Sequence, residues 1–581
     1  MTYTSERNNQ IVIELLRYHQ IRKVVISPGA TNVSFVASIQ NDPFFELYSC
    51  VDERSAAYLA CGLAEESGEP VALSCTGATA SRNYLPGLTE AYYRKLPILA
   101  ITSTMPIDRI GHNIPQVIDR TNVTNDIAKG TYYIPMVDNA EDEWNCTLRV
   151  NAAILELEHH GRGPVHMNVE TRQEGTFDVN QVKPVRQIDR ILVDDSFPSI
   201  NYERIAIFVG AHSKWAEPLM ELVDRFCEQY NAVVIGDHTS NYKGKYSVPS
   251  SLITNQRNKK DQFKNFDLLI HIGNISGAYL GISPREVWRV NPDGKLCDTY
   301  KVLRHAFEME EEVFFEHYIQ PSEKKNTSYY DEWLQEYRTL ESRIGDIPFS
   351  NVWIAKKLSK KIPENSILHL GILNTLRSWN YFEIPKSVLV YCNTGGFGID
   401  GIMSSALGAS FATEKIVYCV LGDLAFFYDM NAIGNRHLKN NLRILVINNG
   451  HGQEFRTHGH RAAQFGEDTD KYIAAAGHYG NKSISLIKHY AEDLGFVYMS
   501  ANDKASFEAV YLQFVSGKQA DAPIVFEVFT NNDDETEATK LILDLNKDVS
   551  TGATEMAKQI LGEKGVKALK SIRIFGGGHR R

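Results

Sequence analysis

The chain has 581 residues, enough for three or four domains of about 150 residues each. Its net charge is −10, with 43% hydrophobic and 23% charged residues, which is the composition of an ordinary globular protein. The acidic balance argues against a nucleic-acid groove, and no stretch approaches the about 20 apolar residues of a membrane span. The polar start of the chain is not typical of a secretory signal. We expect neither a nucleic-acid partner nor a membrane.

The eight cysteines contain no Cys-x-x-Cys pair, and most of them lie inside apolar runs. This usage is typical of small buried side chains in a reducing compartment. We therefore expect a cytoplasmic protein without a disulfide framework or a zinc site.

The first part of the chain alternates between helical and strand patterns. A helix is expected near Glu6–His19 and another opens at Asp52, and the short apolar runs between turn residues predict strands: KVVIS, FELYSCV, VALSC, PILAITS and GPVHMNVE. This alternation predicts a doubly wound parallel sheet over residues 1–180. A polar stretch over residues 171–190 has the composition of a linker.

The same pattern returns twice. A central α/β domain is expected over residues 195–345, with strands at RIAIFVG, AVVIGD, DLLIHIG and EVWRVNP. A third is expected over residues 348–535, with strands at SILHL, SVLVYCN, KIVYCVLGD, LRILVINN and APIVFEVF. Residues 536–581 predict a helical tail that ends in GGGHRR. The predicted fold class is therefore α/β, with three consecutive doubly wound parallel-sheet domains.

Two pairs of adjacent residues at strand ends in the third domain are the main candidates for a functional site. Gly422-Asp423 ends one apolar strand, a helix through Tyr428–His437 is expected next, and Asn448-Asn449 ends the following strand. Open α/β sheets bind ligands at the carboxyl ends of their strands. Asp423 and Asn449, which lie 26 residues apart, are oxygen ligands that suit Mg²⁺ on a diphosphate, and the carbonyl of His451 is a third candidate. The alternative is a helix cap at Asp423 and ordinary turn residues at the asparagines.

This pattern resembles the thiamine-diphosphate-dependent enzyme superfamily, whose signature is Gly-Asp, about this spacing, then Asn-Asn. Leu424 stands where the family usually has a further glycine. The resemblance implies thiamine diphosphate and Mg²⁺ as cofactors. The implied metal ligands are Asp423, Asn449 and His451, and the implied cofactor contacts of this segment are Gly422, Asp423, Leu424, Ala425, Asn449, His451 and Gly452.

The N-terminal domain resembles the pyrimidine-binding domain of the same superfamily. The matching strings are SPGA at residues 27–30, VDERSAA at 51–57 and CTGATA at 75–80, and they place the family's glutamate at Glu53. The resemblance implies that the Glu53 carboxyl hydrogen-bonds the pyrimidine ring of the cofactor and promotes loss of the thiazolium proton. Without the resemblance, Glu53 is a solvated glutamate in a first helical turn. A homo-oligomer is also implied, a homodimer or homotetramer whose pyrimidine and diphosphate domains meet from different chains.

Within the superfamily, the nearest resemblance is to the menaquinone-pathway SEPHCHC synthase, which adds succinic semialdehyde to isochorismate. The matching strings lie at residues 51–57, 82–86 and 397–401, and Gln116 falls where that branch has an active-site glutamine. An ordinary loop glutamine is the alternative. Thr31, Met105 and Thr394 stand where the branch has arginines for its anionic substrate, and neither Thr nor Met replaces an arginine fork. We therefore expect a less charged acceptor than isochorismate.

Acetolactate-synthase-like enzymes are the other relatives implied by the resemblance. They share a Gly-Gly-x-Gly string, here at Gly395, Gly396 and Gly398, and an apolar residue that props the cofactor, here Ile399 or Phe397. His112 is a candidate proton shuttle near Gln116, with a surface loop histidine as the alternative.

The expected activity is decarboxylation of a 2-oxo acid and transfer of the resulting acyl-anion equivalent to an acceptor carbonyl, a carboligase reaction. A simple 2-oxo acid decarboxylase or a C–C lyase is the alternative within the superfamily. A non-catalytic cofactor-binding or assembly homologue is the alternative from another class. A flavin or nicotinamide oxidoreductase would need a glycine fingerprint that the central domain lacks.

Overall fold

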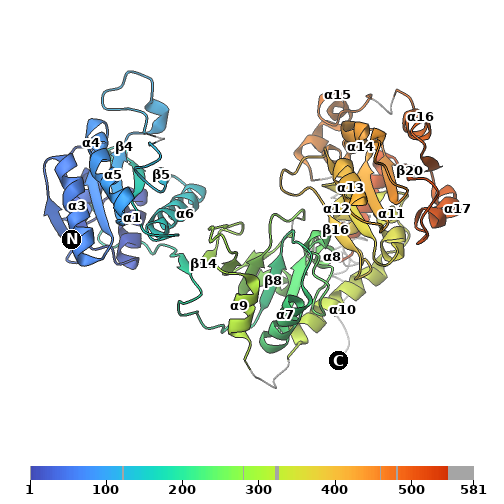
Figure 1. Ribbon diagram of the computed structural model, residues 1–581, viewed down its shortest axis with the longest axis horizontal. Coiled ribbons are helices and arrows are strands. Elements are labelled where there is room, and N and C mark those ends of the chain that lie inside the picture. Colours follow the sequence, from blue (N-terminus) through green and yellow to red (C-terminus); the bar gives the residue numbers. More distant parts are fainter. Residues whose placement is uncertain are drawn as a thin grey trace, which may run out of the picture. The chain divides into compact units, whose positions relative to one another are not determined.

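The computed structural model describes residues 2–120, 123–278, 280–320, 326–457, 459–478 and 482–546. The chain divides into two compact units, one formed by residues 1–197 with 292–308 and the other by residues 198–291 with the chain from 309 onward. Three six-stranded sheets follow one another along the sequence (Figure 1). The predicted fold class is confirmed.

The first sheet lies in the first unit and has the strand order β2-β1-β3-β4-β6-β5, with parallel pairing throughout. Its strands are β1 (Lys23–Ile26), β2 (Glu46–Ser49), β3 (Val71–Cys75), β4 (Ile98–Thr104), β5 (Thr131–Ile134) and β6 (Val165–Glu170). Its helices are α1 (Arg7–Tyr18), α2 (Val33–Ile39), α3 (Glu53–Ser67), α4 (Thr79–Asn83), α5 (Leu85–Arg94) and α6 (Ala140–Glu156).

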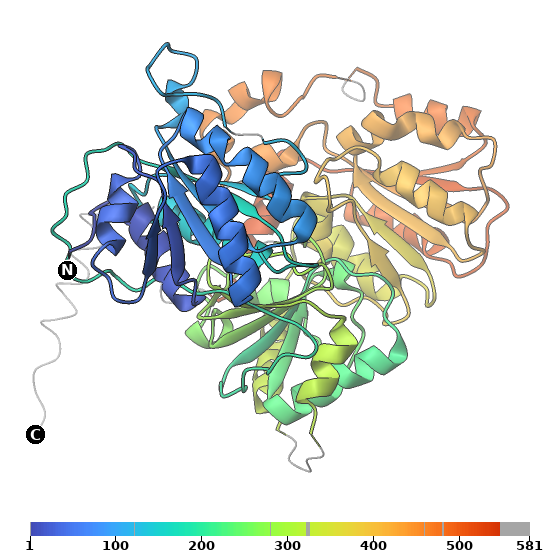
Figure 2. The same cartoon turned by 60° about the vertical axis from the view of Figure 1, so that its left-hand side comes forward.

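Both faces of this sheet are covered by helices (Figure 2). Val24 packs with residues of α1, α2 and α6, whereas its neighbour Val25 packs with residues of α3 and α5. Ala72 and Leu73 divide between the two faces in the same way. Successive strand residues face opposite sides, so a strand covered on both faces must be apolar at every position. This explains the continuous apolar runs.

The strands of the middle segment are divided between the two units. In the second unit, strands pair in the order β13-β11-β8-β9, and in the first unit β7 pairs with β14, all in parallel. The strands are β7 (Asp189–Ile191), β8 (Ile205–Val209), β9 (Ala232–Gly236), β11 (Leu268–Ile272), β13 (Val287–Val290) and β14 (Leu303–Phe307). The other elements of this segment are α7 (Glu217–Tyr230), α8 (Ser250–Thr254), the short pair β10 (Asn265–Phe266) and β12 (Ser283–Pro284), α9 (Glu311–Tyr318) and α10 (Ser328–Arg343).

The third sheet has the order β16-β15-β17-β18-β20-β19 and is also parallel. Its strands are β15 (Ile367–Leu370), β16 (Leu389–Tyr391), β17 (Val417–Gly422), β18 (Leu442–Asn448), β19 (Val497–Ala501) and β20 (Ile524–Phe529). Its helices are α11 (Asn351–Leu358), α12 (Asn374–Trp379), α13 (Ile402–Phe411), α14 (Asp423–Asp429), α15 (Thr469–Tyr472), α16 (Leu486–Asp493), α17 (Lys504–Phe514) and α18 (Asn532–Leu543). Strands β17 and β18 lie in the middle of the sheet.

One predicted element is wrong in its bounds. The helix expected over Tyr428–His437 begins earlier, at Asp423, and its α-helical part ends at Asp429 before a short 3-10 helix over Met430–Gly434. The Asp429 carboxylate accepts hydrogen bonds from the backbone amide and hydroxyl of Ser404, which holds the end of α14 against α13.

The predicted C-terminal tail is described only through residue 546, where α18 and a short turn end, and the rest lies outside the described residues. None of the helices in the described part of the chain combines the length and the hydropathy of a membrane-spanning helix.

Candidate functional site

The Gly-Asp and Asn-Asn pairs lie side by side at the carboxyl edge of the third sheet. Strands β17 and β18 pair in register so that Gly422 lies opposite Ile447, two residues before Asn449. Gly422 precedes the first helical residue, and Asp423 opens α14. The structure therefore brings together the two residues predicted as magnesium ligands.

The Asp423 carboxylate is buried, with only 4% of the residue exposed. The backbone amides of Leu424, Asn449 and Gly450 donate hydrogen bonds to it, and burial nevertheless raises its pKa to about 7. In the described part of the chain, no lysine, arginine or histidine forms an ion pair with this carboxylate. A buried carboxylate that lacks a cationic side chain is a suitable ligand for a metal ion.

The two asparagines that end β18 have different surroundings. Asn448 is buried and donates from Nδ2 to Glu527 Oε1 of β20 at 2.7 Å, so it belongs to the interior of the sheet. Asn449 Oδ1 accepts from the backbone amide of His451 at 3.4 Å and lies in the turn after the strand. Asn449 is thus the member of the pair that is available to a ligand.

The turn that follows Asn449 is held in place by its own hydrogen bonds. His451 Nε2 lies 2.9 Å from Gln453 Oε1, and the amide of Gly452 donates to the carbonyl of Ala474 at 2.6 Å. Gln453 is buried and donates from Nε2 to Asn532 Oδ1 at the start of α18. The sequence interpretation missed Gln453, because its side-chain contacts with His451 and Asn532 follow no recognisable motif.

The loop between β16 and α13 lies at the same edge of the sheet. A side chain at Gly395 or Gly396 would meet no other atom within 4 Å, so the loop is open there. Ile399 is half-buried against the core beneath α13 and α14, and Phe397 has a positive φ of 58°. Ala425 also packs into this core, so its side chain faces the protein.

Glu53 lies in the first unit, at the start of α3. Asp52 caps this helix by accepting from the amide of Ser55 at 2.7 Å. Glu53 is half-buried, and its Oε2 accepts from Asn83 Nδ2 of α4 at 3.1 Å. Asn83 therefore orients the Glu53 carboxylate, a role that sequence spacing does not reveal because the two residues lie 30 positions apart.

Comparison with known proteins identifies the family. Residues 7–123 match the model of the thiamine pyrophosphate enzyme N-terminal TPP-binding domain. The 2-succinyl-5-enolpyruvyl-6-hydroxy-3-cyclohexene-1-carboxylate synthase of Phocaeicola vulgatus is 31% identical over 92% of this chain and 97% of its own length. The chain belongs to the thiamine-diphosphate-dependent enzyme superfamily. The enzyme of the same name from Bacteroides thetaiotaomicron is 30% identical over 93% of this chain and 98% of its own length.

A solved structure also resembles this thiamine-diphosphate-dependent enzyme. The thiamine diphosphate-dependent 4-hydroxybenzoylformate decarboxylase of Rhodococcus jostii is 16% identical and covers 91% of this chain and 100% of its own, with a TM-score of 0.40. This likeness is too low to bear on the fold or the reaction.

The residues at the edge of the third sheet fit the diphosphate end of the family's cofactor. Asp423 offers a buried carboxylate that a metal ion would bind in its charged form, and Asn449 offers a neutral oxygen beside it. The glycines at 395 and 396 leave room for a ligand to approach the backbone.

The positions that carry arginine in the SEPHCHC-synthase branch are occupied differently in this thiamine-diphosphate enzyme. Thr31 is buried, its hydroxyl lies 2.6 Å from that of Thr76, and it accepts from the amide of Gly77 at 3.1 Å. Thr394 is buried and Met105 is half-buried. The Thr31 hydroxyl is therefore engaged within its own domain.

His112 and Gln116 lie on an exposed loop of the first unit that follows a short 3-10 helix over Ile107–Arg109. Gln116 has a positive φ of 64°, and the backbone amide of His112 donates to the carbonyl of Arg109. The roles of both residues remain predictions.

Proposed function

We propose that this protein is a Mg²⁺- and thiamine-diphosphate-dependent carboligase that decarboxylates a 2-oxo acid and joins the resulting acyl-anion equivalent to an acceptor carbonyl. The observation that carries the proposal is the buried Asp423 carboxylate beside Asn449, whose charge the Mg²⁺ ion of a bound diphosphate would neutralise. The bound cofactor supplies the carbon nucleophile and accepts the electron pair left when CO₂ departs.

The residues of the chain have separate roles in this proposal. Asp423 and Asn449 hold the metal ion, with the carbonyl of His451 as the third protein ligand. Glu53 holds a proton at the pyrimidine ring, and the hydrogen bond from Asn83 keeps its carboxylate in one orientation. His112 and Gln116 contact the substrate or move its protons.

The names of the similar relatives favour a C–C bond-forming synthase over a simple decarboxylase or a lyase. The acceptor is less anionic than isochorismate, because Thr31, Met105 and Thr394 provide no guanidinium to bind its carboxylates. A non-catalytic homologue is the weaker alternative, because a protein without the reaction has no need of Glu53, Asp423 and Asn449 together.

The test is CO₂ release from a panel of 2-oxo acids in the presence of thiamine diphosphate and Mg²⁺. Each acid is assayed alone, with neutral aldehydes and with isochorismate as acceptor. We expect release that requires both cofactors, rises with an aldehyde and falls at least about 100-fold in Glu53→Gln. Equal release without an acceptor would favour the decarboxylase, and a preference for isochorismate would overturn the acceptor assignment.

A protein that neither releases CO₂ nor binds the cofactor would overturn the proposal. Calorimetry with thiamine diphosphate and Mg²⁺ provides this second measurement, and cofactor binding without CO₂ release from any acid would favour the non-catalytic homologue.

A further inference from the structure

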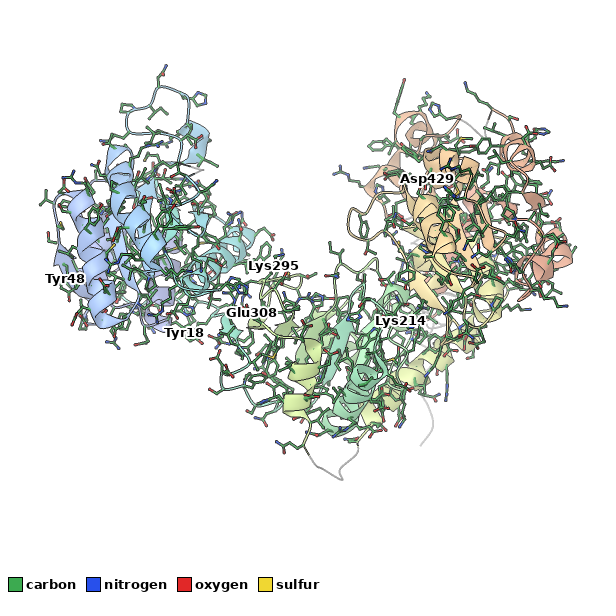
Figure 3. The ribbon with its side chains drawn as sticks, viewed as in Figure 1. Tyr18, Tyr48, Lys214, Lys295, Glu308 and Asp429 are labelled. Carbon is green, nitrogen blue, oxygen red and sulfur yellow. The ribbon has the colours of Figure 1, made fainter. Side chains whose placement is uncertain are left out.

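Three metal-ligating side chains lie together in the first unit, and the proposed reaction uses none of them. His159 and His160 follow the end of α6, and Glu308 directly follows β14; Glu308 is labelled in Figure 3. His159 Nε2 lies 3.3 Å from Glu308 Oε2, and His160 Nε2 lies 3.2 Å from Glu308 Oε1. One ligand atom from each residue lies within 4.8 Å of the others.

The turn that carries the two histidines is fixed by Lys129. Its Nζ donates to the carbonyls of Glu156 at 2.8 Å and Gly161 at 2.6 Å, and also to that of His159. His160 has a φ of 46°, a left-handed conformation that non-glycine residues adopt at a cost. This conformation brings the two imidazole rings to a centroid distance of 3.9 Å, with both facing Glu308.

The orientation of His159 favours a cation at this position. Glu156 Oε2 lies 2.9 Å from His159 Nδ1, so the opposite ring nitrogen, Nε2, is the one turned toward Glu308. His159 Nε2 and Glu308 Oε2 are both buried, and neither has a hydrogen-bond partner among the described residues. A metal ion between these two atoms would bind both of them.

The distances fit a tetrahedral ion. Metal–ligand bonds of about 2.1 Å place the ligand atoms of a tetrahedron about 3.4 Å apart. The two histidine–glutamate distances, 3.3 Å to Oε2 and 3.2 Å to Oε1, are close to this separation, and each involves a different oxygen of the Glu308 carboxylate. Two imidazoles with one carboxylate suit Zn²⁺ and its first-row neighbours, whereas Mg²⁺ prefers oxygen ligands alone.

The surrounding charges limit the affinity. Arg190 Nε lies 3.5 Å from Glu308 Oε2, although the guanidinium is also bound to the carbonyls of Leu155 and Gly294. Glu158 and Asp195 line the adjoining cavity of about 500 Å³, which gives water access to a fourth coordination position.

We propose that His159, His160 and Glu308 bind one first-row divalent metal ion, with Zn²⁺ the best fit, and that the ion links the end of α6 to the end of β14.

The test is a Co²⁺ titration of the full chain after removal of metals, with saturating Mg²⁺ present to occupy the cofactor site. We expect one Co²⁺ per chain with the visible absorption of a tetrahedral ion, its displacement by Zn²⁺, and a rise in the thermal unfolding midpoint with Zn²⁺. His160→Asn and Glu308→Gln should each weaken binding about 10-fold or more. Circular dichroism checks that both variants fold.

His489→Asn is the matched control, because His489 is an exposed histidine of α16 and should leave the titration unchanged. Two results would overturn the proposal: a wild-type chain that takes up no Co²⁺, or binding that persists in both variants. In the first case the contacts of His159 with Glu156 and Glu308 would hold the cluster together without a metal.

Discussion

At the scale of single residues, neighbouring side chains of the same type have unrelated roles. Asn448 donates a hydrogen bond to Glu527 inside the sheet, whereas Asn449, after the end of the strand, accepts one from the amide of His451. The strand ends between them, because β18 stops at Asn448 and Asn449 lies in the turn that follows. The two aspartates at the ends of α14 also differ in their hydrogen-bond partners. The Asp429 carboxylate accepts from the amide and hydroxyl of Ser404, whereas the Asp423 carboxylate accepts from backbone amides.

Asp423→Asn should abolish metal-dependent cofactor binding without loosening the fold. The amide keeps an acceptor for the backbone amides but removes the charge that would bind Mg²⁺. We expect the affinity for thiamine diphosphate with Mg²⁺, measured by calorimetry, to fall at least about 10-fold. The unfolding midpoint without cofactor should be equal or higher at pH 8, because a buried charge is gone.

Asp429→Asn is the control for that experiment. It weakens the bonds to Ser404 and should lower the unfolding midpoint while cofactor affinity stays unchanged. Normal cofactor binding by Asp423→Asn would contradict the metal assignment.

Glu535→Gln should change how stability depends on pH. Glu535 is fully buried in α18, accepts from the amide of Asn351 and the hydroxyl of Thr530, and has a pKa raised to about 7 by burial. The Glu535 carboxyl loses its proton at about pH 4.5 in the unfolded chain but only at about pH 7 in the folded chain. Between these two pH values the folded state binds more protons than the unfolded state, so the free energy of unfolding of the wild type falls as the pH rises. The neutral variant avoids this loss.

The measurement is urea denaturation at pH 5.5 and pH 8. We expect the variant to exceed the wild type by about 1–3 kcal/mol at pH 8 and by clearly less at pH 5.5. Glu537→Gln, an exposed change on the same helix, should show no such difference. Parallel pH profiles for wild type and Glu535→Gln would argue against the raised pKa.

At the scale of elements, one buried arginine joins strand to helix in the third sheet. Arg443 of β18 is 1% exposed and donates to the carbonyl of Phe514, which ends α17, and to those of Ser516 and Lys518. Its guanidinium also reaches the hydroxyl of Tyr418 on β17 at 3.0 Å. A positive charge at a helix C-terminus is favourable, and the planar fork matches several acceptors at once.

Arg443→Met should destabilise the protein by about 2–4 kcal/mol, because several carbonyls lose a charged donor together. Arg443→Lys keeps the charge but cannot reach all four acceptors, so we expect its free energy of unfolding to lie between that of Arg443→Met and that of the wild type. Urea denaturation gives the values, with Arg436→Met as an exposed control. A loss below about 0.5 kcal/mol for Arg443→Met would show that water replaces these contacts.

Most strands could be predicted from the sequence because strands buried on both faces need continuous apolar runs. The end of α14 could not, since it depends on the contact between Asp429 and Ser404, which lie 25 positions apart. Asp423 and Asn449 followed from a local motif at strand ends. Asn83 behind Glu53 and the histidines beside Glu308 depend on contacts across the fold, and spacing along the chain does not encode them.

At the scale of the whole molecule, we propose that Glu53 and Asp423 act in one site built from two chains, as the family resemblance implies. Glu53 lies in the first unit and Asp423 in the second. A shared site of this kind requires at least a dimer with twofold symmetry, in which each site takes one residue from each chain.

Complementation between two inactive variants tests this arrangement. Glu53→Gln and Asp423→Asn should each have strongly reduced activity alone, yet a mixed dimer would contain one site in which both residues are intact. After dissociation and random reassociation of equal amounts, half of the dimers are mixed, so we expect about a quarter of wild-type turnover. A site formed within one chain would give no recovery. Co-incubation without dissociation provides the baseline.

The bonds of Thr31 also constrain how this enzyme could diverge. Its hydroxyl is shared with Thr76 and the amide of Gly77, and a side chain at 77 would lie 2.9 Å from the carbonyl of Ser103. Thr31→Arg alone would leave the Gly77 amide without its acceptor, and it would remove the side-chain contact of the half-buried Thr76 hydroxyl, which keeps the amide of residue 31 as a partner. An evolutionary step toward an arginine at residue 31 therefore costs stability unless a neighbouring change satisfies these groups.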